Sequence, residues 1–547
     1  MPDKREAREN DQLLAQILAN LEARITRIER ELNLSPISPE NAPGTAAHRE
    51  DSDEPEDDLE LRIGLYWFAK VGIVALVIGV VFLLLQPYSG LHPAFASVLG
   101  YVLAGGVMLV SRVLRKSSPF LAGYLLGGGL LLFFFATLRL HYFSAEPVLS
   151  GRPAEVAILL LTAAASLVIS IRKRSIYLVS VGLAMGFATG LMSEQIYSFF
   201  AITLLVAGLT VYVATKYKWP GLLIYGMALT YIVHLIWFLN NPIVGNPLAL
   251  RAVPYPAVIF VLVWVMLFAT GNLLREREDK ENIRVIMSSL LNAGLGYGLF
   301  FLMSVAKFQD RLAISNLGAS IVFLALAVMF WSREKSRFQT FFYAMTGYAA
   351  LSVAIVADFK TPDFFILLCW QSLLVVSTAI WFRSKFIVVT NFVIYAIIFI
   401  AYLAVAGTVS LTSLSFGVVA LLSARLLSWQ RGRLDLKTDK MRTAYLIAAF
   451  FIFPYALYHT VPRDYISLSW LAVAIVYYVI SVILKNAKYR WMALLTFLLT
   501  ALYLIIIGII RLEPVLRIIS FLVLGIVLLA ISFVYAKAKM KSGSKET

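Results

Sequence analysis

Long apolar runs dominate this chain of 547 residues and repeat from residue 59 almost to its end. Each run has roughly 18–23 residues, close to the about 20 that a helix needs to cross a bilayer. Runs of this length are not expected in the core of a water-soluble protein. Because 60% of the residues are hydrophobic and only 15% are charged, we predict an all-α, polytopic membrane protein.

The first apolar run fixes where the chain enters the membrane. It extends over residues 59–85, follows a polar segment, and carries Tyr66 and Trp67 where aromatic rings favour the headgroup region. From there we expect about 18 transmembrane helices. The expected spans are residues 66–85, 94–113, 119–138, 154–171, 175–192, 196–215, 220–239, 255–274, 283–304, 313–331, 338–357, 363–382, 386–406, 410–429, 443–460, 466–484, 490–509 and 514–536.

Basic residues alternate between successive connections. With the N-terminus in the cytoplasm, the cytoplasmic connections and the C-terminal tail carry 29 Lys and Arg, and the external connections carry nine. Lys and Arg accumulate on the cytoplasmic side of membrane proteins. We therefore expect both termini in the cytoplasm. The net charge of +16 then reflects topology and contacts with membrane lipids, and no nucleic-acid partner is expected.

The segment before the membrane has two parts. Residues 1–34 are expected to form a cytoplasmic helix with an apolar heptad seam at Leu14, Leu18, Leu21, Ile25, Ile28 and Leu32. This seam indicates either a short coiled coil that makes a homo-oligomer through residues 10–33, or an amphipathic helix on the membrane or on the protein's own loops. Residues 35–58 are Pro-rich and acidic and are expected to be a disordered linker. The transmembrane domain then extends over 59–540, and residues 541–547 form a basic cytoplasmic tail.

Four segments resemble the bacterial predicted membrane protein family known as domain of unknown function 2339. They are the coiled coil with its linker, the Leu59–Gly64 segment leading through Trp67 to Leu83, the glycine-rich Leu125–Gly129, and the last span from Arg517 to Gly525 with Ser532 and Tyr535. The resemblance implies a multi-pass protein of the bacterial cytoplasmic (inner) membrane. It implies no activity.

Motifs that would indicate an enzyme or a cofactor are missing from the sequence. It contains no GxxxxGK[ST] phosphate-binding loop. Its only cysteine, Cys369, lies in an apolar run and is expected to be a packing residue. His92, His141 and His459 are too far apart in sequence to indicate a zinc site. We therefore expect no cofactor and no metal, and the sequence favours a protein that is not an enzyme.

Charged residues on the expected external side, and one histidine inside a span, are the candidate site residues. They are Arg139, His141, Glu146, His234, Arg463, Asp464, Arg511, Glu513 and Arg517. The external charges indicate either a site for an anionic lipid head or a sugar, or ion pairs that only hold loops together. His234 indicates either a proton relay or substrate contact, or a histidine hydrogen-bonded to a neighbouring helix.

Glycines spaced by four predict close helix packing. They are Gly182, Gly186 and Gly190, then Gly123 and Gly127, then Gly294 and Gly298. We find no clear internal repeat in the sequence.

Three functions remain open from the sequence. The first is a transporter or a protein that handles envelope lipids, because nearly all of the chain lies in the membrane. The second is a non-catalytic scaffold that recruits partners through the coiled coil. The third is a membrane-embedded glycosyl or acyl transferase. This third function is disfavoured because the first external loop, residues 86–93, has no acidic residue.

Overall fold

The computed structural model describes residues 68–86, 88, 91–143, 147–149, 151–193, 195–274, 282–405, 412–429, 438–508, 515, 518–526 and 529. The expected coiled coil, the linker and the basic tail lie outside these residues. Contacts divide the chain into two units, residues 1–72 and 73–547. Helix α3 (Phe68–Leu85) begins in the first unit and continues into the second, which contains all later helices.

All regular elements among the described residues are helical. The α-helices are α3 (Phe68–Leu85), α4 (Phe95–Leu114), α5 (Pro119–Leu138), α6 (Arg152–Arg172), α7 (Ile176–Met192), α8 (Ile196–Lys216), α9 (Pro220–Phe238), α10 (Pro256–Leu273), α11 (Ile283–Lys307), α12 (Leu312–Glu334), α13 (Arg337–Asp358), α14 (Asp363–Trp381), α15 (Lys385–Val405), α16 (Ser413–Trp429), α17 (Thr438–Thr460), α18 (Ile466–Leu484) and α19 (Ala487–Tyr503). Short 3₁₀ segments are η3 (Pro242–Val244), η5 (Gln309–Arg311) and η7 (Arg463–Tyr465), and η8 (Leu504–Gly508) continues α19 with π-helical geometry.

The helices confirm the all-α, polytopic prediction. Within the described residues, 14 helices are long and apolar enough to cross a membrane, and three more apolar helices are shorter. Each expected span up to residue 509 coincides with one of these helices. The last expected span is only partly described, and its residues 518–526 are helical.

Local sequence signals explain several helix starts. Proline occupies one of the first two positions of α5, α6, α9 and α10, where its missing N–H costs nothing. The side chains of Ser175, Asn282 and Asn486 accept hydrogen bonds from the first turns of α7, α11 and α19.

Helix α17 shows the largest departure from the expected boundaries. It begins at Thr438, and not near residue 443, so Arg442 belongs to the helix and not to a connection. Arg442 is buried and its Nη1 lies 3.5 Å from a carboxylate oxygen of Asp439, one turn earlier. The ion pair allows a charged residue inside the helix, which a hydropathy pattern does not reveal.

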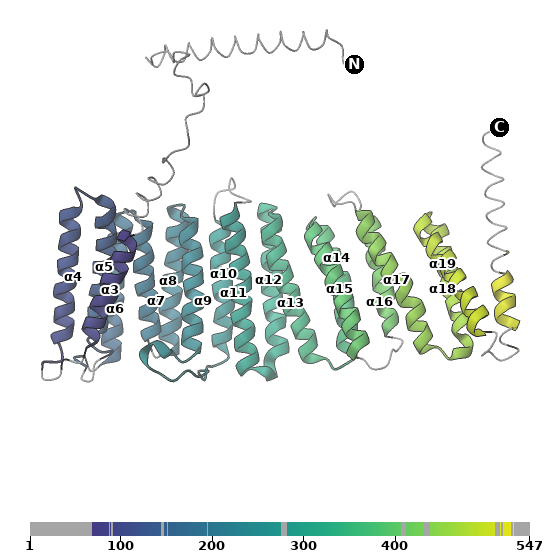
Figure 1. The fold of residues 1–547 in the computed structure, drawn as a ribbon, viewed down its shortest axis with the longest axis horizontal. Helices are drawn as coiled ribbons and strands as arrows, with labels where there is room; N and C mark the ends of the chain where they lie inside the picture. The colour runs from purple at the N-terminus through teal and green to yellow at the C-terminus, as the bar shows by residue number, and fades with distance from the viewer. Residues whose placement is uncertain are drawn as a thin grey trace, which may run out of the picture. The chain divides into compact units, whose positions relative to one another are not determined.

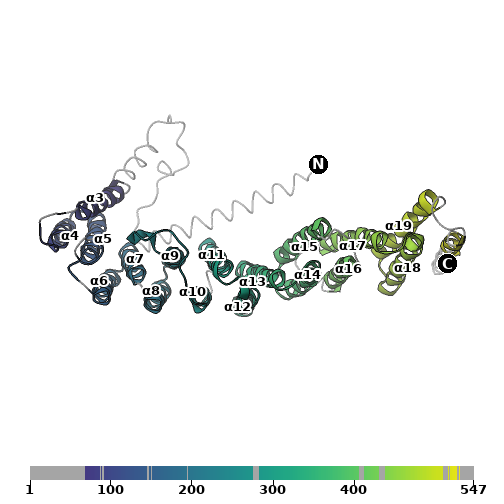
Figure 2. The ribbon, with the colours of Figure 1, turned by 90° about the horizontal axis from the view of Figure 1, so that it is seen from below.

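Packing follows the order of the chain. From α4 on, most helices have their main contacts with the next helix or with the helix two places along. From α6 to α19, odd-numbered helices lie in one layer and even-numbered helices in another (Figure 2). The connections alternate between two ends of the helices (Figure 1). We call the end with the α4–α5, α6–α7, α8–α9, α10–α11 and α12–α13 connections the basic end, and the other the opposite end.

The glycine prediction is confirmed for α7. A Cβ at Gly182, Gly186 or Gly190 would lie 2.8–3.0 Å from Leu167, Val206 or Thr203 on neighbouring helices. A Cβ at Gly127 would lie closer still, 2.5 Å from the Tyr177 ring, whereas Gly123 has open space.

The prediction is wrong for α11, where a Cβ at Gly294 or Gly298 would meet nothing within 4 Å. The close approach occurs at Gly296, between Val265 and Tyr231. The packed face of α11 contains residues 292 and 296, whereas residues 294 and 298 are exposed.

Candidate functional site

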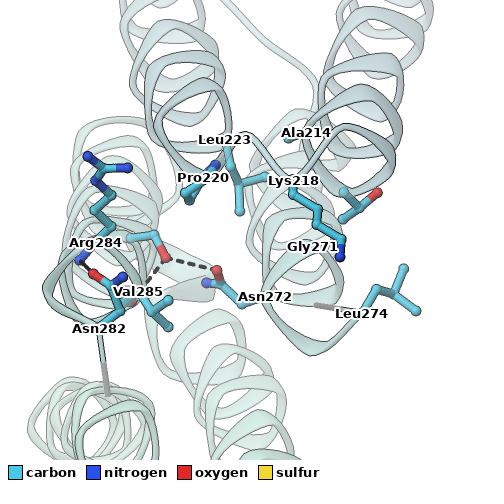
Figure 3. Close-up of a pocket in the computed structure, with 12 residues that line it drawn as sticks. Ala214, Lys218, Pro220, Leu223, Gly271, Asn272, Leu274, Asn282, Arg284 and Val285 are labelled. Carbon is cyan, nitrogen blue, oxygen red and sulfur yellow. Dashed lines mark hydrogen bonds between the residues drawn. The ribbon is translucent and has the colours of Figure 1, made fainter. Parts of the chain in front are cut away.

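A cavity of about 170 Å³ lies at the basic end, where α8 and α10 end and α9 and α11 begin (Figure 3). Its lining comes from all four helices and their connections. The lining residues are Ala214, Thr215, Lys218, Pro220, Leu223, Gly271, Asn272, Leu274, Asn282, Arg284, Val285 and Ser288. The volume has room for about five water molecules, which is enough for a phosphate-sized group.

Positive charge gathers at the mouth of this cavity. Lys218 and Arg284 contribute basic side chains from the α8–α9 connection and the first turn of α11. Helices α9 and α11 both begin here, and helix N-termini carry a partial positive charge. Asn282 fixes the start of α11, because its Oδ1 accepts a hydrogen bond of 3.1 Å from the Arg284 N–H. This arrangement favours an anionic group.

The inner wall of the cavity is polar and buried. Ser288 donates a hydrogen bond of 2.9 Å to Asn272 Oδ1, and both side chains are buried. Behind them Asn272 Nδ2 lies 3.4 Å from Ser289 Oγ, and Gln339 Nε2 donates to the same hydroxyl at 3.1 Å. Leu223 adds an apolar surface beside this polar wall. The cavity therefore presents polar and apolar surfaces together.

A hydrogen-bonded hub lies one turn further along α11. Asn292 accepts a hydrogen bond of 2.7 Å from the Tyr231 hydroxyl. Its Nδ2 donates to Val265 O at 2.9 Å and to the Tyr343 hydroxyl at 2.8 Å. The Asn292 amide thus joins α9, α10, α11 and α13. It holds together the helices that form the cavity wall.

The charges expected at the external side are only partly described. Arg139 is buried at the end of α5, and its Nε donates a hydrogen bond of 3.0 Å to Leu84 O. Burial lowers the pKa of the Arg139 guanidinium from its ordinary value, and Tyr88 partly opposes this change. His141 Nδ1 lies 2.7 Å from Leu149 O.

Other predicted site residues lie elsewhere or outside the described residues. Arg463 and Asp464 belong to η7, between α17 and α18, and this hairpin has no substantial contact with the end of α5. The positions that fall outside the described part are Glu146, Arg511, Glu513 and Arg517. The structure therefore keeps Arg463 and Asp464 apart from Arg139 and His141.

His234 is buried among aromatic rings in α9. The Trp264 indole N–H of α10 donates a hydrogen bond of 3.0 Å to His234 Nδ1. Of the two roles expected for His234, this bond matches the histidine that is hydrogen-bonded to a neighbouring helix. The other ring nitrogen, Nε2, has no hydrogen-bond partner among the described residues.

A family model described as "Predicted membrane protein (DUF2339)" matches residues 64–464. The chain belongs to this family. The match starts in the first span and ends before the final span, so the Arg517–Gly525 motif lies outside it. Comparison with curated proteins and with solved structures finds no significant match.

The cavity of this DUF2339 member is not predicted from its sequence, in which Lys218 and Arg284 indicate only topology. Ser288 and Asn292 are spaced by four along α11, and this spacing places polar groups on one helical face. That spacing is the signal that could have indicated a polar wall. Among the residues the structure describes, no group of three His, Cys, Asp or Glu could hold a metal ion.

Proposed function

We propose that this protein handles envelope lipids in a bacterial inner membrane by binding an anionic lipid head group in the cavity between α8, α9, α10 and α11. One observation carries the proposal. The cavity lies at the ends of four apolar helices, and it combines a basic mouth, a polar wall and an apolar side.

The chemistry of the lining matches an anionic lipid more closely than a free sugar. Lys218 and Arg284 supply cationic donors for a phosphate, and the start of α11 adds backbone polarity of the same sign. Leu223 and Leu274 supply apolar surface for the first acyl carbons. Basic pockets between membrane helices on the cytoplasmic side are a known mode of lipid head-group binding.

The proposed orientation places the basic end in the cytoplasm, with both termini on that side. The excess of Lys and Arg in every second connection supports it. The cavity would then face the inner leaflet, where anionic lipids give a negative surface potential.

Lipid retention tests the proposed function. The full chain is purified from nanodiscs that contain phosphatidylglycerol or only phosphatidylcholine, and bound lipid is counted by native mass spectrometry. We expect wild-type protein to retain phosphatidylglycerol selectively. Arg284→Gln should weaken retention by about tenfold or more, because a charged hydrogen bond contributes roughly 1.5–3 kcal/mol.

Arg172→Gln is the matched control, because Arg172 is an exposed arginine at the same end of the helices, on α6. It should leave retention unchanged. Equal retention by wild type and Arg284→Gln, or no preference for the anionic lipid, would refute the lipid-binding proposal.

Cysteine labelling tests the proposed orientation separately. Cys369 is buried, so labelling by a maleimide will report on cysteines introduced at exposed positions. Ser117 lies in the α4–α5 connection at the basic end, and Leu248 lies in the α9–α10 connection at the opposite end. In intact spheroplasts, an impermeant maleimide should label L248C and not S117C. The reverse pattern would invert the topology.

A further inference from the structure

Glu155 is a buried acid in the first turn of α6, at the opposite end. Its side chain is 0% exposed. Neither carboxylate oxygen has a hydrogen-bond partner among the residues that the structure describes. Glu155 is not among the candidates selected from the sequence, although it falls inside the expected span 154–171.

The position of Glu155 on α6 explains its burial. Leu159, Ala163 and Leu167 follow it at intervals of four and are all buried. Residues spaced by four lie on one face of a helix, and α6 packs on α5 and α7. Glu155 therefore belongs to the inward face of α6.

Tyr101 of α4 is a titratable residue on another helix that interacts electrostatically with Glu155. The Tyr101 hydroxyl donates its hydrogen bond to Thr137 Oγ1 at 3.1 Å. Thr137 in turn donates to Phe133 O at 2.9 Å. The hydroxyls of Tyr101 and Thr137 thus both donate to other acceptors, and neither donates to Glu155.

The charged groups on the elements around Glu155 are few. Arg139 at the end of α5 bonds Leu84 O and makes no ion pair with Glu155. His141 in the α5–α6 connection bonds Leu149 O. Helix α7 carries no Lys, Arg, His, Asp or Glu, and its Tyr177 packs against Tyr124. On α6 itself, Arg152 lies three residues earlier in the sequence.

An acid in the first turn of a helix often stabilises the helix N-terminus. Neither oxygen of Glu155 makes a hydrogen bond with a backbone N–H group of the described residues, so only the weaker attraction of the helix dipole acts on the charged form. An ionised carboxylate buried without a partner costs several kcal/mol. The neutral acid avoids most of this cost. A metal cation would need several ligands, and no group of three His, Cys, Asp or Glu among the described residues could hold one.

We propose that Glu155 is a proton-binding site inside the membrane domain. It takes up and releases a proton at the opposite end of the helices, where α6 begins. The carboxylate gains the proton on one oxygen, the acid is neutral in the resting state, and release returns the charged form. This proposal is independent of lipid binding at the basic end.

Labelling with the hydrophobic carbodiimide dicyclohexylcarbodiimide tests the proposal, because this reagent modifies protonated carboxyl groups within the membrane. Full-length protein in membranes is labelled at a series of pH values, and modified peptides are quantified by mass spectrometry. We expect Glu155 to be labelled at about pH 6, with labelling falling roughly tenfold per pH unit once the acid ionises.

Glu155→Gln should lose this modification, whereas Asp363→Asn, at an exposed acid in the first turn of α14, should leave it unchanged. Because the main measurement uses wild-type protein, it does not depend on the folding of a variant. Labelling that does not change with pH would overturn the proposal. Absence of labelling, together with a stability difference between wild type and Glu155→Gln that stays constant across pH, would also overturn it. Protection by sodium chloride but not by choline chloride would also overturn it, because the occupant would then be a metal cation.

Discussion

Two buried polar regions of this molecule contrast sharply. Around Asn292 in α11, each side-chain nitrogen and oxygen of the amide has a hydrogen-bond partner on another helix. Around Glu155 in α6, the carboxylate has none among the described residues. Buried polar groups are normally paired, so the two regions serve different purposes. The first fixes helices in place, and the energy of the second depends on whether a proton is bound.

The hydrogen-bonding arrangement around Asn292 occurs again in a third region. In α15, Asn391 Nδ2 donates to Ser372 O of α14 at 3.2 Å and to the Tyr445 hydroxyl of α17 at 3.1 Å. As at Asn292, one amide binds a carbonyl of the preceding helix and a tyrosine two helices further on. The two hubs are four helices apart, although the sequence shows no clear repeat.

The largest effect is expected from Asn292→Leu. It removes the partner of the Tyr231 and Tyr343 hydroxyls and of Val265 O, all of which are buried. The free energy of unfolding should fall by about 2–4 kcal/mol, because each orphaned group costs roughly 1 kcal/mol in a membrane setting. Denaturation with sodium dodecyl sulfate measures it. A change below about 0.5 kcal/mol would show that the hub does not hold the helices together.

A smaller loss is expected from Gly296→Ala. The added Cβ would lie 2.9 Å from the Tyr231 hydroxyl oxygen and closer still to Val265, so the hub must shift. We expect a loss of about 1–3 kcal/mol in the same denaturation measurement. Gly294→Ala, on the same helix with open space around it, is the matched control and should cause no loss. Equal effects of the two variants would contradict the packing described for α11.

Glu155→Gln should change stability by less than about 1 kcal/mol near about pH 4, below the ordinary pKa of a glutamate, because no ion pair is broken and the neutral acid resembles the amide. As pH rises, wild-type protein must either keep its proton or bury a charge. Its stability should therefore fall relative to Glu155→Gln. The difference between their denaturation midpoints across pH measures this effect. A constant difference would mean that Glu155 binds protons equally in the folded and unfolded protein, which would contradict the proposal.

The smallest effect on stability is expected from Arg284→Gln. The Arg284 side chain is exposed and only its backbone N–H takes part in the cap of α11. We expect a change within about 0.5 kcal/mol, together with the weakened lipid retention. A large destabilisation would assign Arg284 a structural role instead.

Hydropathy and charge predicted most of the fold from the sequence. Apolar length sets each span, and the start of α5 at Pro119 or of α9 at Pro220 follows from local chemistry. The site could not be predicted in the same way. Asn292 and Tyr343 meet only after α11 and α13 pack together, and Glu155 resembles a solvated helix start until its face is known. The N-terminal coiled coil and its role in oligomerisation or recruitment remain predictions.

A cryo-electron microscopy map of the full chain in nanodiscs tests the central claim most directly. In discs containing phosphatidylglycerol, the account predicts head-group density in the cavity between Lys218 and Arg284, and its absence in discs of phosphatidylcholine alone. A cavity that is empty in both maps, while phosphatidylglycerol is resolved elsewhere on the protein, would contradict it.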